Sequence, residues 1–380
     1  MADGSVQGLT QDRYAAARAQ FEENLRTGED IGASFCATVE GEIVVDLWGG
    51  FADPAKTRAW ERDTVINVYS TTKTMCALTA LLIADRGELD FDASVAKYWP
   101  EFAANGKADV KVSHLMSHSA GLSGWKEKIT TEDLYDWDKA TSLLAAQAPY
   151  WPAGTAPGYH ALTQGYLVGE VVRRITGKSL GTVFREEIAE PLGADFWIGL
   201  PASEDHRVAE LMPPPMGVGD QPGQTELMKN MSLNPGIDIS ATKTRAWRGA
   251  EIPAAGGTGN ARSVAQVHVI LANGGVAQGK RFMSEAGCRK ALELQVEGQD
   301  LILGAPSRFG LGFGLGGGMM PLPNPNDSMY WGGYGGSLIL IDMKAHTTFA
   351  YVMNKMQPTT QGDMRGLGLA MAMWTAMGTI

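Results

Sequence analysis

Strand-forming sequence is concentrated towards the two ends of this chain, and helix-forming sequence lies between them. Residues 33–39 and 42–48 are rich in β-branched, aromatic and small residues and flank Glu40-Gly41, which predicts an antiparallel hairpin. Three more strand-like segments follow near the other end, at 309–315, 330–342 and 347–353. This order predicts an α+β fold: an α/β sandwich domain, in which helices flank an antiparallel sheet, plus an inserted mainly helical domain.

Helical patterns fill most of the remaining sequence. Between 201 and 249 the periodicity fades and Pro213-Pro214-Pro215 appears, so we expect a long irregular segment, either a flap over the substrate or a solvated loop. The predicted division is residues 1–75 and 250–380 for the sandwich domain and 76–249 for the helical domain, with the active site between them. Helices are expected near 11–25, from Met75 to Gly87, and at 112–121, 162–176, 264–271 and 367–377.

Composition limits the classes of partner. The 380 residues carry a formal net charge of −10, without the clustered basic face expected of a nucleic-acid-binding protein. No apolar run approaches the roughly 18 residues of a membrane span, and the first residues do not resemble a signal peptide. The three cysteines are far apart and lie in apolar or unpatterned sequence. We therefore expect a cytoplasmic protein without a nucleic-acid or membrane partner; its oligomeric state stays open.

The best candidate for a catalytic element lies where an extended segment becomes an apolar helix. Ser70 begins the sequence Ser-Thr-Thr-Lys, so Lys73 follows it by three residues and shares its helical face. A serine hydroxyl needs a neighbouring base to act as a nucleophile. Burial near a helix N-terminus disfavours the charged form of a lysine, so Lys73 could accept the Ser70 proton.

The Ser-x-x-Lys pattern by itself is weak evidence. It occurs three more times, at Ser94, Ser123 and Ser240, and a serine N-cap followed by an exposed lysine is its commoner explanation. Tyr159 strengthens the Ser70 site, because it ends a Pro/Gly-rich loop just before a helix. Nearby ammonium groups would lower its pKa, so Tyr159 beside Lys73 could shuttle a proton; the alternative is an aromatic side chain that anchors the loop.

A glycine-rich stretch at 330–340 could bring a backbone N–H towards a developing oxyanion, or could simply be a β-bulge. His114 and His118 are four residues apart, but no third metal ligand accompanies them, so we expect structural histidines. The alternating glycines at 310–316 fit a strand better than a phosphate-binding loop, because prolines rather than a helix follow. We expect neither a metal nor another cofactor.

Together these segments resemble the serine β-lactamase and penicillin-binding protein superfamily, and within it the class C-like esterases called family VIII carboxylesterases. The resemblance covers most of the chain. Its motifs are Ser70-Thr71-Thr72-Lys73, the segment 112–122, Pro152-Ala153-Gly154-Thr155 with Tyr159, the segment 251–255, and Trp331-Gly332-Gly333.

The resemblance implies a β-lactamase/transpeptidase-like fold with Ser70 as the acylated nucleophile. It implies that Lys73 and Tyr159 transfer protons, without saying which of them is the general base. The backbone N–H groups of Ser70 and Tyr334 would form the oxyanion hole, and the segment Trp331-Gly332-Gly333 would bind substrate.

Two departures from the lactamase pattern favour an uncharged ester. Ala161 stands where an asparagine is expected, and Trp331-Gly332-Gly333 replaces Lys-Thr-Gly, which removes a cation that would pair with a β-lactam carboxylate. The resemblance therefore implies hydrolysis of small carboxylic esters, with weak cephalosporin hydrolysis as a side activity. The alternatives are an acyltransferase or D-amino-acid amidase or peptidase of the same superfamily, and a catalytically silent ligand-binding protein.

Overall fold

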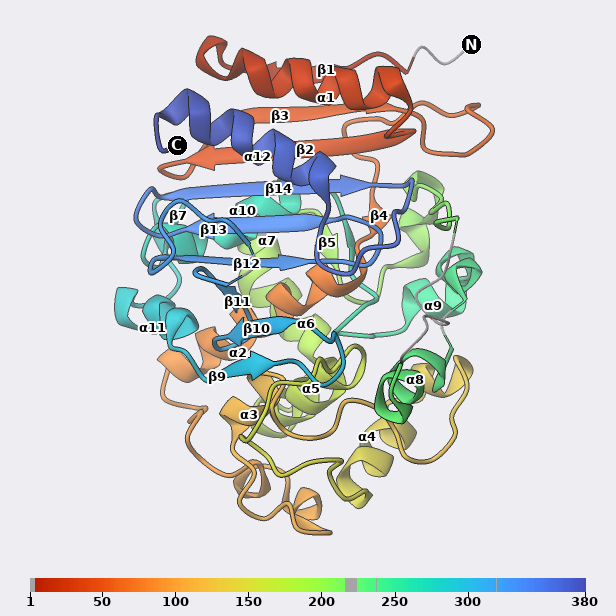
Figure 1. Cartoon of the computed structure of the whole chain (residues 1–380), viewed down its shortest axis with the longest axis vertical. Coiled ribbons are helices and arrows are strands. Elements are labelled where there is room, and N and C mark those ends of the chain that lie inside the picture. The colour runs from red at the N-terminus through yellow and green to blue at the C-terminus, as the bar shows by residue number, and fades with distance from the viewer. Residues whose placement is uncertain (1–3, 216–223, 237, 319) are drawn as a thin grey trace.

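The computed structural model describes residues 4–215, 224–236, 238–318 and 320–380. Within these residues the largest sheet is nine-stranded and antiparallel, in the order β1-β3-β2-β14-β13-β12-β11-β10-β9 (Figure 1). Its strands are β1 (Gln7–Thr10), β2 (Gly32–Val39), β3 (Glu42–Gly50), β9 (Val296–Gln299), β10 (Pro306–Phe309), β11 (Gly314–Leu315), β12 (Ser328–Gly332), β13 (Leu338–Asp342) and β14 (Thr347–Met353).

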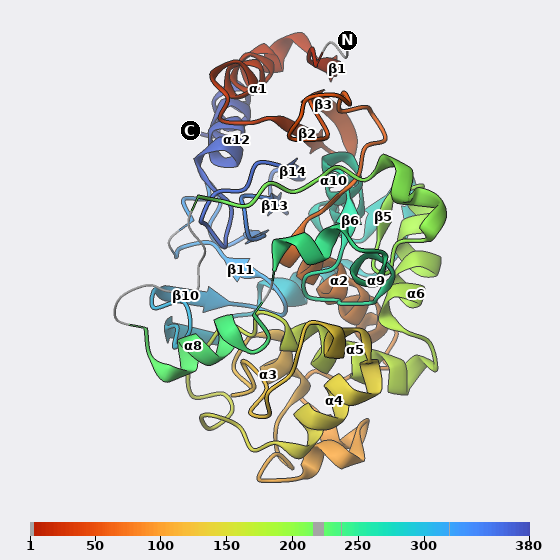
Figure 2. The ribbon, with the colours of Figure 1, turned by 90° about the vertical axis from the view of Figure 1, so that its right-hand side faces the viewer.

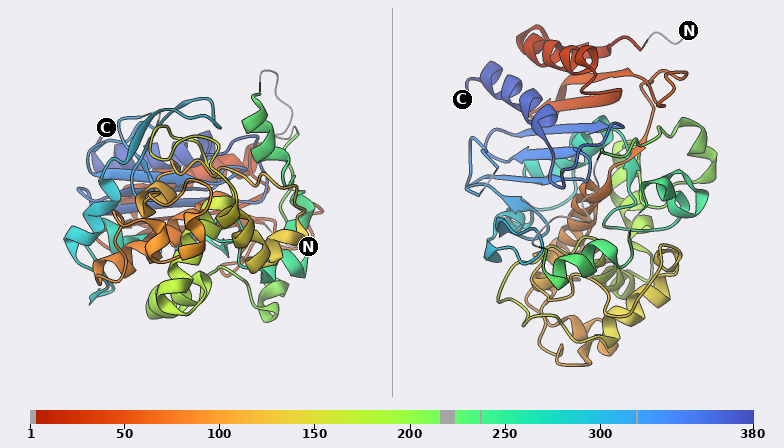
Figure 3. Two further views of the ribbon diagram at one scale, coloured as in Figure 1. Left: turned by 90° about the horizontal axis from the view of Figure 1, so that it is seen from below. Right: turned by 45° about the vertical axis from the view of Figure 1, so that its right-hand side comes forward.

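The two ends of the chain meet inside this sheet. Strand β14 pairs with β2 along its whole length, from Thr347 opposite Val39 to Met353 opposite Ala33. Every residue of β14 is buried, because helices cover both faces of the sheet. Helices α1 (Ala15–Thr27) and α12 (Met364–Met377) pack together on one face, and α10 (Ala261–Ala272) lies on the other (Figures 1 and 3).

Helix α2 (Thr72–Asp85) is the link between the sheet and the helical part of the chain. Its residues from Thr72 to Ile83 are all buried, as the apolar sequence predicts. It packs against α5 (Thr163–Thr176) and α6 (Leu180–Phe184) (Figure 2). The other helices are α3 (Val112–Met116), α4 (Trp137–Ala146), α7 (Glu190–Leu192), α8 (Glu226–Leu233), α9 (Arg245–Gly249) and α11 (Glu285–Arg289). Short strands β4 (Ile66–Asn67), β6 (Thr258–Gly259) and β5 (Phe196–Trp197) form a second sheet, and β7 (Val276–Ala277) pairs with β8 (Lys280–Arg281).

The predicted fold class is confirmed, and so are the hairpin of β2 with β3 and the helices α1, α2, α5, α10 and α12. Four local predictions are wrong. The segment 330–342 is not one strand, because β12 ends at Gly332 and the chain turns before β13 begins at Leu338 and pairs with it. The segment 309–315 is two strands and not one, because the chain reverses between them and Gly310 donates to the carbonyl of Phe313 at 2.9 Å. The helix predicted over 112–121 ends at Met116, where Ser117 leaves helical geometry and His118 adopts a positive φ of 59°.

The last correction concerns the segment 201–249, which is not irregular throughout. It contains α8 and α9, whose N-termini are capped by the hydroxyls of Thr225 and Thr244. Positions 216–223 and 237 of the predicted flap lie outside the described residues, and the division into two domains stays a prediction. No helix among the residues described is long and apolar enough to cross a membrane.

Candidate active site

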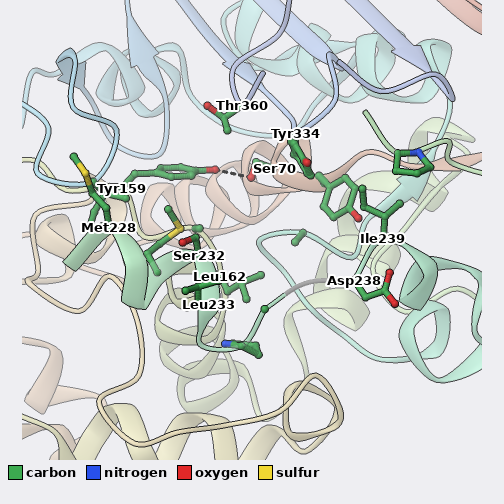
Figure 4. Close-up of a pocket in the computed structure, with 18 of the residues that line it drawn as sticks. Ser70, Tyr159, Leu162, Met228, Ser232, Leu233, Asp238, Ile239, Tyr334 and Thr360 are labelled. Carbon is green, nitrogen blue, oxygen red and sulfur yellow. Dashed lines mark hydrogen bonds between the residues drawn. The ribbon is translucent and has the colours of Figure 1, made fainter. Parts of the chain in front are cut away.

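Ser70 lies at the turn between the short strand β4 and helix α2. Tyr69 has a positive φ of 45°, which ends the extended segment and turns the chain into the helix. The Tyr69 ring is held edge-on between Trp247 and Tyr334, with ring centroids 6.4 and 5.6 Å away. Ser70 is 8% exposed and lines a cavity of about 1010 Å³ (Figure 4). The local sequence and this aromatic packing therefore hold the hydroxyl at the cavity wall.

Lys73 is fully buried one turn further along α2. Its Nζ lies 3.1 Å from Ser70 Oγ and donates to the carbonyls of Ala161 at 2.6 Å and Ala254 at 3.0 Å. Burial lowers the pKa of Lys73 well below its ordinary value. A neutral amine has two N–H donors and one lone pair, which matches two carbonyls and one hydroxyl that donates its proton. This geometry fits a lysine that accepts the proton of Ser70.

Tyr159 approaches Ser70 from the other side. Its hydroxyl lies 2.5 Å from Ser70 Oγ, and Lys73 Nζ is 4.9 Å from the centre of its ring. The expected lowering of the Tyr159 pKa is wrong. Burial raises that pKa instead, because desolvation disfavours the phenolate more than its neighbours favour it. The phenol therefore stays protonated and can donate to Ser70 Oγ.

Asp300 supports the tyrosine loop and was missed by sequence reasoning. This carboxylate is 1% exposed, and its Oδ1 accepts the backbone N–H groups of Tyr159, Ile302 and Leu303 at 3.1, 2.8 and 2.8 Å. The N–H of Leu301 also donates to the Pro157 carbonyl at 2.9 Å. A lone aspartate gave no signal of this role, since its partner Tyr159 is distant in sequence.

The turn between β12 and β13 is fastened to the Ser70 element. Ser337 donates its hydroxyl proton to the Val68 carbonyl at 2.9 Å, and its Oγ is also 2.9 Å from Thr71 Oγ1. A Cβ on Gly333 would lie 2.2 Å from the same carbonyl oxygen, so only glycine allows this approach. Tyr334, the next residue, lines the cavity together with Ser70.

The structure places the predicted substrate-binding residues behind the cavity wall. Trp331 is 2% exposed and stacks on His118 with centroids 5.2 Å apart, while its ring lies 6.0 Å from that of Tyr159. A Cβ on Gly332 would lie 2.1 Å from the backbone of Gln361, so this glycine serves close packing. Trp331 thus supports the tyrosine, and the wall itself is formed here by Tyr334 and Thr360 (Figure 4).

The two histidines singled out from the sequence have backbone partners. His114 Nδ1 accepts the N–H of Lys111 at 3.2 Å, and His118 Nδ1 accepts the N–H of His160 at 3.0 Å. Burial lowers the pKa of His118 well below its usual value, so its imidazole is neutral. Among the residues described, no group of three His, Cys, Asp or Glu side chains could hold a metal ion.

Comparison with known proteins shows the family to which the chain belongs. Residues 18–370 match the family model described as Beta-lactamase. The chain is 34% identical over 377 residues to the Esterase/beta-lactamase LipL of Mycobacterium tuberculosis, covering 95% of this chain and 86% of that protein. The crystal structure of a family VIII carboxylesterase is 44% identical with a TM-score of 0.93, and covers 98% of this chain and all of that one.

A penicillin-binding protein homologue from Caulobacter crescentus has the same fold. It is 38% identical with a TM-score of 0.91, over 98% of this chain and 100% of that chain. Fold and sequence therefore agree with these proteins along nearly the full length of the chain. The chain belongs to the beta-lactamase family and is similar within it to a family VIII carboxylesterase.

Proposed function

We propose that this protein is a carboxylesterase that hydrolyses small carboxylic esters through an acyl-enzyme on Ser70. The observation that carries the proposal is the position of Ser70 Oγ, 3.1 Å from Lys73 Nζ and 2.5 Å from the hydroxyl of Tyr159. A nucleophile thus has a proton acceptor on one side and a proton donor on the other. The esterase names of its relatives agree with this chemistry.

Acylation starts with attack of Ser70 Oγ on the ester carbonyl carbon while its proton passes to neutral Lys73. The carbonyl oxygen becomes an oxyanion, and we assign its stabilisation to the backbone N–H groups of Ser70 and Tyr334. Collapse of this intermediate breaks the bond to the alcohol, which leaves with the proton from Lys73, relayed by Tyr159. Water then attacks the acyl-enzyme by the same proton transfers, releasing the carboxylic acid and restoring Ser70.

The substrate expected from the sequence is an uncharged ester. Ala161 offers its carbonyl to Lys73, and its methyl side chain provides no amide group to a substrate. The acylation step is shared with β-lactam hydrolysis, so the proposal includes slow turnover of cephalosporins, and LipL carries both activities in its name. A cytoplasmic location is part of this proposal, and the three cysteines are free and buried.

The test is intact-protein mass spectrometry after mixing with p-nitrophenyl esters and, separately, with a cephalosporin. Wild type should gain one acyl mass that decays quickly for esters and slowly for the cephalosporin, and Ser70→Ala should gain none. Ser94→Ala is the matched control, since Ser94 has the same Ser-x-x-Lys spacing but does not line the cavity. A folded wild-type protein that forms no adduct with any ester would refute the proposal.

A further inference from the structure

Helix α8 forms one wall of the cavity beside Ser70, and its packing is unusual. None of the side chains of Glu226–Leu233 is buried. Met228 and Met231 are three residues apart and so share one face of the helix. Both line the cavity, as does Leu233, which is 56% exposed (Figure 4). Met231 packs partly against the hydrophobic core, and the part of this apolar face that remains accessible is open to whatever enters the cavity.

Amide side chains fix α8 in this orientation. Asn230 donates to the Trp125 carbonyl at 3.1 Å and accepts the hydroxyl proton of Tyr150 at 3.0 Å. Asn234, just after the helix, donates to the same Trp125 carbonyl at 2.8 Å and accepts the N–H of Ile129 at 2.9 Å. With a further bond from Asn234 to the Glu127 carbonyl at 2.8 Å, these hydrogen bonds hold the polar side of the helix to the segment 125–150. They keep the methionine face turned towards the cavity.

Other residues that line the cavity are apolar as well. Ile302 and Leu303 line the cavity from the loop that Asp300 ties to Tyr159, and Leu162 lines it from the start of α5. Met228 reaches towards this loop, because a Cβ on Gly304 would lie 3.3 Å from its terminal methyl group. Methionine side chains are flexible and adapt to ligands of different shape. The space next to Ser70 is thus bounded by apolar groups on two sides.

The charged side chains that line the cavity interact with other protein groups. Among the described lining residues Lys243 is the one cation, and its Nζ lies 2.8 Å from Glu210 Oε2. Asp238 accepts the backbone N–H and the hydroxyl of Ser240 at 2.9 and 2.5 Å, which keeps it ionised. An anionic substrate would be repelled by the carboxylate of Asp238, and the cation of Lys243 is already paired with Glu210.

We propose that the α8 face formed by Met228 and Met231 selects uncharged esters whose acyl chain is larger and more apolar than acetyl. This inference rests on the proposed esterase function and adds the substrate class. A volume of about 1010 Å³ is at the upper end of ligand pockets, which span about 300–1000 Å³, so an acetyl group would leave most of the apolar wall without contact. Each methylene that reaches this wall should raise kcat/KM about two- to fourfold.

The experiment measures kcat/KM for p-nitrophenyl acetate, butyrate, hexanoate and octanoate, so that the leaving group stays constant. A matched pair of substrates is p-nitrophenyl pentanoate and the mono-p-nitrophenyl ester of glutaric acid. The two acyl chains have the same number of carbon atoms, and the second ends in a carboxylate where the first ends in a methyl group. Wild type is compared with Met228→Ala, Met231→Ala and Met231→Lys. Met364→Ala is the control for loss of a methionine, because Met364 is 70% exposed on α12 and does not line the cavity. Thermal unfolding by circular dichroism confirms that each variant is folded.

For wild type and Met364→Ala we expect kcat/KM to be at least tenfold higher for hexanoate than for acetate. We also expect it to be at least thirtyfold higher for pentanoate than for the glutarate monoester. In both alanine variants kcat/KM should depend less on the length of the acyl chain. In Met231→Lys the ratio of kcat/KM for the glutarate monoester to that for pentanoate should rise tenfold or more. A flat wild-type profile, equal rates for the matched pair, or an unchanged profile in all three α8 variants would overturn the assignment. If no ester acylates Ser70 at all, the esterase function itself fails, which is a different result.

Discussion

The carboxylate of Asp300 accepts the backbone N–H of Tyr159 at 3.1 Å, across 141 positions of sequence. The same Oδ1 accepts the N–H groups of Ile302 and Leu303, which line the cavity. One buried oxygen therefore holds both the tyrosine that contacts Ser70 and part of the apolar wall. We regard Asp300 as a positioning residue for both.

Two substitutions of Asp300 should distinguish the effect of its hydrogen bonds from the effect of its negative charge. Asp300→Ala leaves three backbone N–H groups without their acceptor, each at a cost of about 1–3 kcal/mol, so we expect lower stability and kcat/KM reduced about 10- to 100-fold. Asp300→Asn keeps an acceptor oxygen without the charge, so it should retain most of the wild-type stability and most of the wild-type kcat/KM. Steady-state kinetics and urea unfolding measure the two effects. If asparagine is as damaging as alanine, the charge matters and the hydrogen bonds do not.

The pH dependence of acylation should follow Lys73. Its pKa is well below the ordinary 10.5 because the side chain is buried, and only the neutral amine can accept the Ser70 proton. We therefore expect kcat/KM to fall as pH decreases through the lowered pKa of Lys73 and to reach its plateau below pH 10.5. Lys73→Arg, whose guanidinium stays charged, should lose about 10³-fold or more at every pH. An active arginine variant with an unchanged pH profile would exclude Lys73 as the base.

Tyr159 should act as a hydrogen-bond donor in its neutral form. Burial raises its pKa, so Tyr159 should not cause a loss of activity at pH values below the ordinary tyrosine pKa of about 10. Tyr159→Phe removes the 2.5 Å contact with Ser70 while keeping the ring, and we expect kcat to fall about 10²- to 10⁴-fold. The melting temperature should change little. Burst kinetics with a p-nitrophenyl ester will show whether acylation or deacylation slows, and an unaffected kcat would remove Tyr159 from the mechanism.

Arg365 should be essential for the turn that carries Tyr334. Its guanidinium donates to the Gly335 carbonyl at 3.0 Å and to the carboxylates of Asp30 and Asp363 at 2.8 and 2.6 Å. Arg365→Met leaves the buried carboxylate of Asp30 and the half-buried one of Asp363 without their cation, so we expect a loss of about 3–5 kcal/mol in the free energy of unfolding.

Urea denaturation measures this loss directly. The matched control is Arg26→Met, because Arg26 forms an exposed ion pair with Glu23 on α1, and its removal should leave the unfolding midpoint nearly unchanged. Equal midpoints for Arg365→Met and Arg26→Met would show that the buried network does not stabilise the fold.

The sequence by itself determined the elements that local patterns encode. Alternation of β-branched residues and turn glycines located the hairpin of β2 with β3, and apolar periodicity with a terminal glycine located α5. The same local signals identified the turn at Ser70 and the spacing to Lys73. These features depend on neighbours within one turn or one hairpin, so the order of residues is enough to predict them.

The tertiary structure decided whatever depends on residues that are distant in sequence. The pKa of Tyr159 rises because segments from across the chain remove its water, whereas sequence reasoning considered only the neighbouring charges. Trp331 is buried behind Tyr159, and Asp300 reaches the tyrosine loop, through contacts that no local pattern records. The cavity that Met228 shares with Ile302 and Leu303 likewise forms only when folding brings these distant segments together.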